Sequence, residues 1–192
     1  MYTCDPRIVP ILIDQMYKPG GTTYWAFEAF NYYLPNDKET TDALLKAALQ
    51  RGMPQGMLWT LKKRGLDEKQ IKKLIEVSLS PEHPDAWAEG ALAAQQYCDD
   101  EFTARLIAIA TDPQSRARNQ AIYALARNRT DESVATLKAL LDEPDPPQKI
   151  GRGIAETVHD AIRSAYRYRH RGNTHGRPLR KDDFGGEFQK PE

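Results

Sequence analysis

The stretch 106–125, Leu-Ile-Ala-Ile-Ala-Thr-Asp-Pro-Gln-Ser-Arg-Ala-Arg-Asn-Gln-Ala-Ile-Tyr-Ala-Leu, decides the fold of this chain. Apolar residues recur at helical spacing before its centre and again after it. Between the two halves, Thr111-Asp112-Pro113 interrupts the periodicity, because proline disfavours helical backbone in the residue that precedes it. The stretch therefore predicts two helices joined by a short turn.

The same helix–turn–helix plan recurs along the chain. Aspartate is a good helix N-cap, and one stands before each of five apolar-periodic segments, at intervals of 32, 30, 33 and 31 residues. These aspartates are Asp5, Asp37, Asp67, Asp100 and Asp131. The other predicted helix pairs are 6–17 with 23–34, 39–51 with 54–64, 68–79 with 85–97, and 132–141 with 154–170. A compact bundle of unrelated helices is the alternative, but it does not predict regular caps.

The residues around the central turn resemble a HEAT repeat. Asp112, Pro113 and Arg118, followed by an alanine-rich helix, match the spacing of the family motif. The resemblance extends over residues 5–171 and is strongest in 99–142. It implies an all-α fold, a right-handed solenoid of about five repeats, with second helices lining the concave side. It also implies that Asp112 and Arg118 belong to a polar ladder between stacked repeats.

The chain divides into a predicted solenoid domain, 1–171, and a segment, 172–192, that we expect to be extended or disordered. The segment contains four glycines and two prolines and shows no periodicity. Phe184 and Phe188 stand four residues apart in its polar context. They have the pattern of a binding segment, which docks either on a partner or back on the solenoid.

Aligning the second helices on their small residues predicts a shared binding face. Positions two and six residues after the aligned residue lie four apart, so they share one side of each helix. Aromatic and cationic residues, typical of interface anchors, dominate these positions. The candidate binding residues are Glu28, Tyr32, Trp59, Lys63, Tyr97, Tyr123, Arg127, Arg163 and Arg167. The same residue types also occur as partly buried core or as solvated helix faces, and this alternative stays open.

Composition excludes several classes of protein. Lys+Arg and Asp+Glu both number 27, the apolar fraction is 40%, and mean hydropathy is −0.67. No apolar run approaches the ~18 residues that span a bilayer, and no secretory signal begins the sequence, so we expect a cytoplasmic protein without membrane contact. The two cysteines exclude a disulfide scaffold. Nucleotide-binding, hydrolase and metalloprotease motifs are missing, so we expect no cofactor and no metal ion.

Three functions remain. The favoured one is a non-enzymatic interaction module or assembly subunit that holds another protein, with an acidic or mixed surface, in its concave groove. The second is nucleic-acid binding through residues such as Arg127 and Arg163, supported by the basic segment 151–181 but opposed by a net charge of zero. The third, implied by the family resemblance, is a lyase or chaperone for a tetrapyrrole-bearing protein.

Overall fold

The computed structural model of the chain describes residues 5–18, 23–97, 100–128, 130–143 and 153–169, with side chains except those of Pro6, Thr23, Asp100 and 166–169. Their regular structure is helical throughout, without a strand, as the sequence predicts. No helix in this part of the chain has the length and apolar character needed to cross a membrane. The predicted extended segment 172–192 lies outside the described residues. The chain forms two compact units, unit 1 (Met1–Gly90) and unit 2 (Ala91–Glu192).

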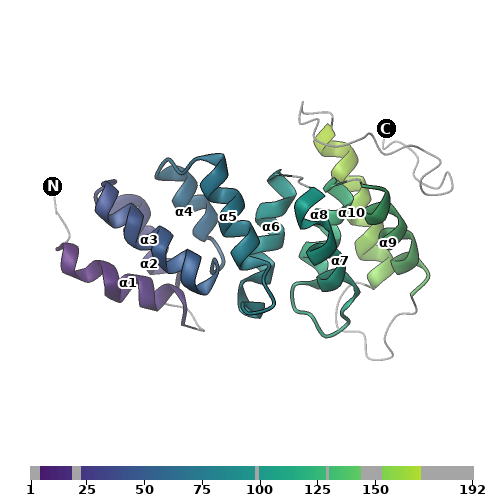
Figure 1. Ribbon diagram of the computed structural model, residues 1–192, viewed down its shortest axis with the longest axis horizontal. Helices are drawn as coiled ribbons and strands as arrows, with labels where there is room; N and C mark the ends of the chain where they lie inside the picture. The colour runs from purple at the N-terminus through teal and green to yellow at the C-terminus, as the bar shows by residue number, and fades with distance from the viewer. Residues whose placement is uncertain (1–4, 19–22, 98–99, 129, 144–152, 170–192) are drawn as a thin grey trace. The chain divides into compact units, whose positions relative to one another are not determined.

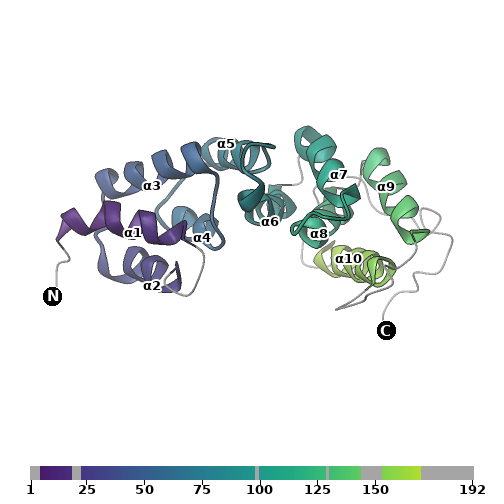
Figure 2. The same ribbon diagram turned by 90° about the horizontal axis from the view of Figure 1, so that it is seen from below.

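Unit 1 is built from short helices that pack in neighbouring pairs. α1 packs against both α2 and α3, α3 packs against α5, and α4 packs against η2 (Figures 1 and 2). Its elements are η1 (Pro6–Ile8), α1 (Val9–Met16), α2 (Thr23–Glu28), η2 (Ala29–Tyr33), α3 (Lys38–Arg51), α4 (Met57–Lys63), α5 (Glu68–Ser78), η3 (Pro84–Ala86) and the start of α6 (Trp87–Tyr97).

Two of the predicted aspartate caps are present in unit 1. The Asp37 carboxylate accepts the backbone N–H of Thr40 at 2.7 Å at the start of α3. At the start of α5, Asp67 and Gln70 form a reciprocal capping box, with bonds of 2.8 and 3.0 Å. These caps satisfy N–H groups that have no partner within the helix. The sequence signals for the starts of α3 and α5 are therefore confirmed.

The predicted cap at Asp131 is wrong by one residue. Thr130 is the N-cap of α9 (Asp131–Leu141), and its hydroxyl oxygen accepts the backbone N–H of Ser133 at 3.1 Å. Asp131 is the first residue of the helix, where its negative charge favours the positive end of the helix dipole. Threonine and aspartate cap helices by the same hydrogen bond, so the adjacent pair made the register ambiguous.

The second predicted helix, 23–34, is not a continuous α-helix. It changes at Ala29 into the π-helical segment η2, in which the Leu34 N–H donates to the Ala29 carbonyl at 2.8 Å, five residues back. Such wide turns are frequent at functional sites. Phe30 stays buried in this segment, whereas Tyr32 and Tyr33 are both exposed. The wide turn therefore belongs to the part of α2–η2 that presents aromatic rings to solvent.

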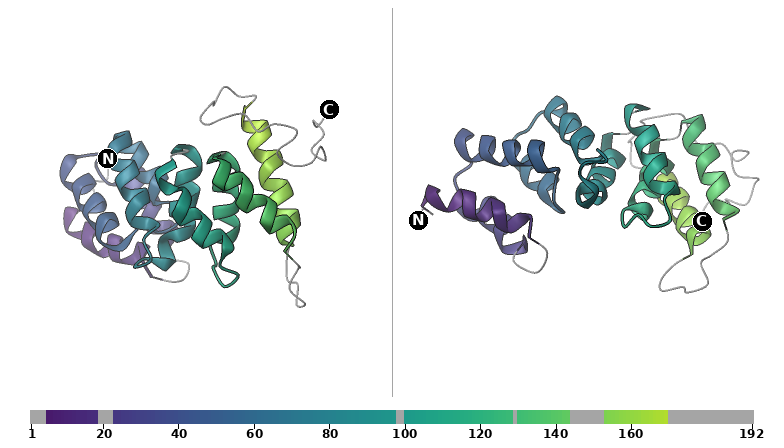
Figure 3. Two further views of the ribbon diagram at one scale, coloured as in Figure 1. Left: turned by 45° about the vertical axis from the view of Figure 1, so that its right-hand side comes forward. Right: turned by 60° about the horizontal axis from the view of Figure 1, so that its bottom comes forward.

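Unit 2 contains the helix pair from which the sequence analysis began. α7 and α8 pack against each other, α8 packs against α10, and α9 and α10 lie side by side (Figure 3). The pair is joined by a turn at Asp112, as predicted, and its apolar residues Leu106, Ile122 and Leu125 are buried. The unit comprises the end of α6, η4 (Asp100–Phe102), α7 (Thr103–Thr111), α8 (Arg118–Asn128), α9 and α10 (Ile154–Arg169).

Candidate functional site

Small or apolar residues set the orientation of every second helix. The five residues used for the alignment are at most 1% exposed, so each lies on the buried side of its helix: Ala26, Met57, Ala91, Ala121 and Ala161. The candidate positions two and six residues later lie on another part of each helix surface. Whether that part is exposed differs between the two units.

In unit 1 the structure brings four candidate residues together. Glu28 and Tyr32 come from α2–η2, and Trp59 and Lys63 come from α4. The Lys63 ammonium nitrogen lies 4.2 Å from the centre of the Tyr32 ring and 5.2 Å from that of Trp59, so both rings attract one cation. The same ammonium donates to the Asn31 carbonyl at 3.0 Å, which ties α4 to η2.

Glu28 orients a further aromatic ring beside this group. The Tyr24 hydroxyl donates to the Glu28 carboxylate at 2.8 Å, one helical turn away. That hydrogen bond raises the pKa of the Tyr24 hydroxyl. The Tyr24 ring meets the Trp25 ring edge to face, with centroids 5.7 Å apart. Rings on α2 are therefore held in defined positions although they are exposed.

Four of these residues, Tyr24, Glu28, Tyr32 and Trp59, line a pocket of about 1080 Å³ within unit 1. Its floor is apolar, because Met16, Phe27 and Met53 line it and are buried. Its polar lining includes Asn31 and Gln55, and its charged lining is mixed in sign: Lys18, Glu28, Arg51 and Asp85. Pockets near this volume are large enough for a drug-sized ligand or a short peptide.

The sequence analysis missed one side of this pocket. Tyr17, at the end of α1, lines it together with Arg51, the last residue of α3. The Arg51 guanidinium lies 3.8 Å from the centre of the Tyr17 ring and pairs with Asp14 at 3.0 Å. The Tyr17 hydroxyl donates to the Gly52 carbonyl at 2.9 Å, and burial raises the pKa of that hydroxyl. No periodic signal links these residues, because they meet only through packing.

Exposed aromatic residues are concentrated in unit 1. We name the five residues Tyr24, Trp25, Tyr32, Tyr33 and Trp59 the aromatic surface; they are 55–67% exposed. Among the described residues of unit 2, Leu92 is the large apolar side chain that is exposed. A cluster of exposed apolar rings on a monomer marks an interaction site.

The candidate residues of unit 2 have different surroundings. The Tyr123 hydroxyl donates to the Asp160 carboxylate at 2.8 Å, which links α8 to α10. Tyr97 and Arg127 are half-buried, and Arg163 is exposed. Arg167 lies in α10, but its side chain is outside the described residues. Among these residues, Tyr123 therefore helps to hold α8 against α10 through its hydrogen bond to Asp160.

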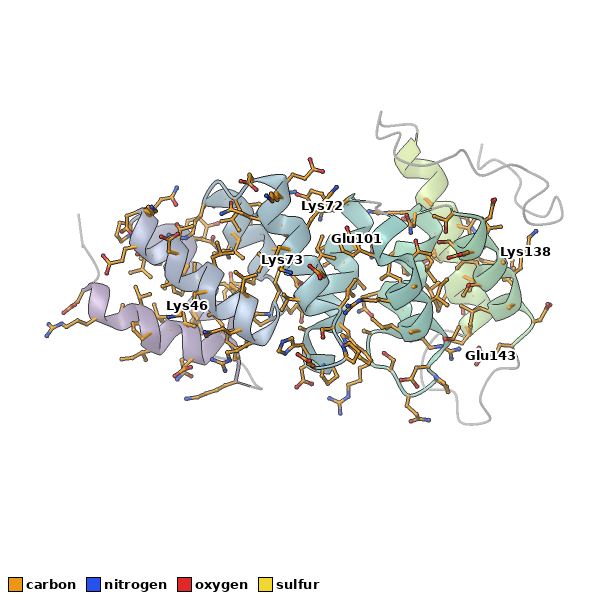
Figure 4. The ribbon with its side chains drawn as sticks, in the orientation of Figure 1. Lys46, Lys72, Lys73, Glu101, Lys138 and Glu143 are labelled. Carbon is orange, nitrogen blue, oxygen red and sulfur yellow. The ribbon has the colours of Figure 1, made fainter. Side chains whose placement is uncertain are left out.

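The predicted ladder residues, Arg118 and Asp112, each make polar contacts within unit 2. The buried Arg118 side chain donates to the Ala110 carbonyl at 2.8 Å and forms an ion pair with Glu143, labelled in Figure 4. The Asp112 carboxylate accepts the backbone N–H of Gln114 at 2.9 Å and so shapes the turn. Arg118 therefore joins α7, α8 and the end of α9 within unit 2, and a ladder through Asp112 stays a prediction.

Glu89 is a buried carboxylate behind the pocket. Only 4% of this α6 residue is exposed, and its carboxylate accepts the backbone N–H of Leu58 at 3.2 Å. Burial raises the pKa of Glu89, and the hydrogen bonds from the backbone at Gly56 and Leu58 oppose that shift without cancelling it. Glu89 thus holds the start of α4, the helix that carries Trp59.

We expect Glu89→Gln to change how stability depends on pH. Because the pKa of Glu89 is raised in the folded protein, the folded state binds this proton more tightly than the unfolded state does. The wild type therefore gains stability relative to the variant as pH falls from 7 through the raised pKa, while glutamine keeps an oxygen acceptor. Urea unfolding of both proteins at several pH values measures the free energy of unfolding of the wild type minus that of the variant. A value that stays constant or falls as pH is lowered contradicts the assignment.

The described residues hold no group of His, Cys, Asp and Glu arranged to bind a metal ion. No curated protein and no solved structure matches the chain. A family model described as HEAT repeats does match, over residues 71–155, which run from α5 to the start of α10. This range contains the Asp112-Pro113 turn and Arg118, the residues on which the resemblance was based. Residues 71–155 of this chain are therefore similar to HEAT repeats, as the sequence analysis expects.

Proposed function

We propose that this protein is a non-enzymatic interaction module that binds another protein through unit 1. In this proposal residues 1–171 form a right-handed solenoid of about five HEAT-like repeats, located in the cytoplasm, whose second helices share a binding face. HEAT repeats generally serve as protein-interaction scaffolds. The observation that carries the proposal is the aromatic surface, whose rings Tyr24, Tyr32 and Trp59 line the pocket. Tryptophan and tyrosine in such positions are the typical anchors of protein interfaces.

The charges around the pocket favour a protein over a nucleic acid. Arg51 already pairs with Asp14, and Lys63 already donates to a carbonyl and faces two rings. Glu28 and Asp85 add negative charge to the same lining. Nucleic-acid affinity depends mainly on cations that are available to phosphates, and this surface offers few. The mixed charges instead suit the polar rim of a protein interface.

Affinity capture with matched variants tests the proposal. The wild-type chain and the variants Trp59→Ala and Leu92→Ala, each immobilised, are exposed to an extract of the source cells. We expect a partner that Trp59→Ala loses and Leu92→Ala keeps, since Leu92 is an exposed apolar residue of unit 2. With the partner purified, Trp59→Ala should weaken affinity at least ~30-fold, the effect of removing a hot-spot residue.

Two results would overturn this function. The first is a purified partner that binds Trp59→Ala and a Tyr32→Ala variant as tightly as the wild type. The second is binding of duplex or single-stranded DNA at about 50 mM salt that falls steeply as salt is raised, which is the signature of phosphate contacts.

A further inference from the structure

We propose that the pocket of unit 1 binds an arginine side chain, which a protein partner presents next to a large apolar residue. The inference rests on the proposed function, because it takes this pocket to be the protein-binding site. It adds the chemistry that the partner must carry. Unpaired negative charge, aromatic rings and a buried apolar floor in the pocket lining each favour such a ligand.

The cations of the pocket lining already have partners, whereas its carboxylates have no cation. Arg51 lines the pocket, and its guanidinium pairs at 3.0 Å with Asp14, which is not part of the lining. Lys18, the other cation of the lining, also interacts with another group. Within the described part of the chain, Glu28 accepts one hydrogen bond from a hydroxyl, and neither Glu28 nor Asp85 forms an ion pair. The unpaired charge of the pocket is therefore negative, and a cationic ligand complements it.

Aromatic rings lie beside one of these carboxylates. The Tyr24 hydroxyl donates to Glu28 at 2.8 Å, and both residues line the pocket, as do the exposed rings of Tyr32 and Trp59. Lys63 faces the last two rings but does not line the pocket, so its ammonium does not fill the site. An aromatic face attracts a cation through its quadrupole, and a carboxylate attracts it through its charge. Rings and carboxylate therefore favour the same ligand group.

Unit 1 already contains an arginine that is held in this way. The Arg51 guanidinium lies 3.8 Å from the centre of the Tyr17 ring and pairs with the Asp14 carboxylate. Tyr24 and Glu28 offer the same two groups, a ring and a carboxylate, without a cation of the chain between them. A planar guanidinium stacks on a ring while its N–H groups pair with a carboxylate, whereas an ammonium is a compact point charge. The arrangement therefore favours arginine over lysine.

The apolar floor of the pocket determines what stands next to the arginine. Met16, Phe27 and Met53 form this floor and are buried. The pocket has the volume of a site for a drug-sized ligand, so it accommodates more than one side chain. An apolar side chain that covers the floor contributes affinity in proportion to the area it buries, whereas an ion pair near solvent contributes little. The partner should therefore carry a large apolar residue beside its arginine.

Titration of the full chain with four matched tripeptides tests the proposal. The probes, acetylated at the N-terminus and amidated at the C-terminus, are Leu-Arg-Leu, Leu-Lys-Leu, Leu-Gln-Leu and Leu-Glu-Leu. The indole N–H signals of the three tryptophans report binding by NMR, and Trp59→Phe identifies the signal that belongs to the pocket. We expect Leu-Arg-Leu to shift this signal and to bind at least ~10-fold more tightly than Leu-Gln-Leu and about 3-fold more tightly than Leu-Lys-Leu.

Two substitutions of Glu28 identify the group that the arginine meets. Glu28→Gln removes the charge but keeps an oxygen that can accept the Tyr24 hydroxyl, so the ring keeps its hydrogen bond. We expect this variant to bind Leu-Arg-Leu about 5–10-fold more weakly than the wild type does, with its affinity for Leu-Gln-Leu unchanged. Glu28→Arg should reverse the preference and bind Leu-Glu-Leu more tightly than Leu-Arg-Leu.

A control variant separates this contact from a general charge effect. Glu76→Gln makes the same charge change at another half-buried glutamate of unit 1, which pairs with Lys73, labelled in Figure 4, and does not line the pocket. It should bind all four peptides as the wild type does. Raising the salt from about 50 to 500 mM should weaken Leu-Arg-Leu several-fold and leave Leu-Gln-Leu unchanged, because salt screens charges near the surface. Circular dichroism checks that every variant is folded.

Leu-Arg-Leu that does not bind up to about 10 mM, or binds no more tightly than any of the other three peptides, would overturn the proposal. Equal binding of Leu-Arg-Leu by Glu28→Gln and the wild type would do the same. The proposed function fails separately. A purified partner whose affinity falls with Trp59→Ala but not with Glu28→Gln supports that function and overturns this inference. Leu-Arg-Leu binding that depends on Glu28, without any partner that depends on Trp59, supports this inference alone.

Discussion

Gly52→Ala is expected to lower the free energy of unfolding of unit 1 by about 3–5 kcal/mol. Gly52 ends α3 with φ 72° and ψ 174°, a backbone conformation that is open essentially to glycine alone. A Cβ at this position would lie 2.5 Å from the Cβ of Ala86 and 3.3 Å from that of His83. The substitution therefore adds backbone strain to a steric overlap that only a shift of η3 relieves.

The same substitution should also disturb the pocket. Ala86, which a Cβ at position 52 would meet, and Met53, which follows Gly52, both line the pocket. The Gly52 carbonyl also accepts a hydrogen bond from the Tyr17 hydroxyl. Moving η3 away from the end of α3 changes the distance between Ala86 and the other pocket residues Met53 and Tyr17. We expect ligands of the pocket to bind the folded variant several-fold more weakly than the wild type, an effect that a purely global loss of stability would not produce.

Gly65→Ala is the matched control for Gly52→Ala. Gly65 also has a positive φ, 85°, but a Cβ there would meet nothing within 4 Å. We expect the control to lose about 1 kcal/mol, the strain of an alanine at positive φ without a clash. All three tryptophans, Trp25, Trp59 and Trp87, lie in unit 1, so urea unfolding followed by their fluorescence measures this unit. Equal losses for the two variants would contradict the clash.

The helices of this chain could be predicted from sequence where periodicity and turn residues agree. The pair around Asp112-Pro113 and the starts of α3 and α5 are such places. Two kinds of detail could not be predicted. In the π-helical segment that begins at Ala29, the backbone hydrogen bonds span five residues instead of four, and no proline or glycine in the segment marks this change. Thr130 and Asp131 are adjacent and both suit an N-cap, so the choice depends on the backbone.

Part of the candidate site could be predicted for the same reason. Ala26 and Met57 fix how their helices face the core, which determines where Tyr32 and Trp59 point. Repeat alignment therefore found Glu28, Tyr32, Trp59 and Lys63 on the second helices of unit 1. It did not find the other exposed rings of α2–η2, which are Tyr24, Trp25 and Tyr33. It could not find Tyr17 and Arg51, because these residues come from first helices and meet across two repeats. Nor could it tell which unit exposes its rings, since that depends on what packs against each helix.

Arg118→Ala is expected to lower the free energy of unfolding of unit 2 by about 2–4 kcal/mol. Its side chain is 9% exposed, and it donates to the Ala110 carbonyl near the end of α7 while pairing with Glu143. Alanine removes the charged hydrogen bond and leaves a buried carbonyl without its donor, which carries the larger penalty. Unit 2 contains no tryptophan, so fluorescence does not report on its unfolding. Far-UV circular dichroism during urea unfolding is used instead to measure this loss.

Two further variants separate the possible causes of that loss. Glu143→Gln keeps an oxygen acceptor for Arg118, and the side chain at this position is 33% exposed to solvent. We therefore expect the variant to lose about 1 kcal/mol or less of its free energy of unfolding. Asp112→Asn keeps the oxygen that accepts the Gln114 N–H, and we expect a change within about 0.5 kcal/mol. If Asp112→Asn instead loses as much as Arg118→Ala, the two residues act together as the HEAT ladder implies, and the contacts of Arg118 with Ala110 and Glu143 are secondary.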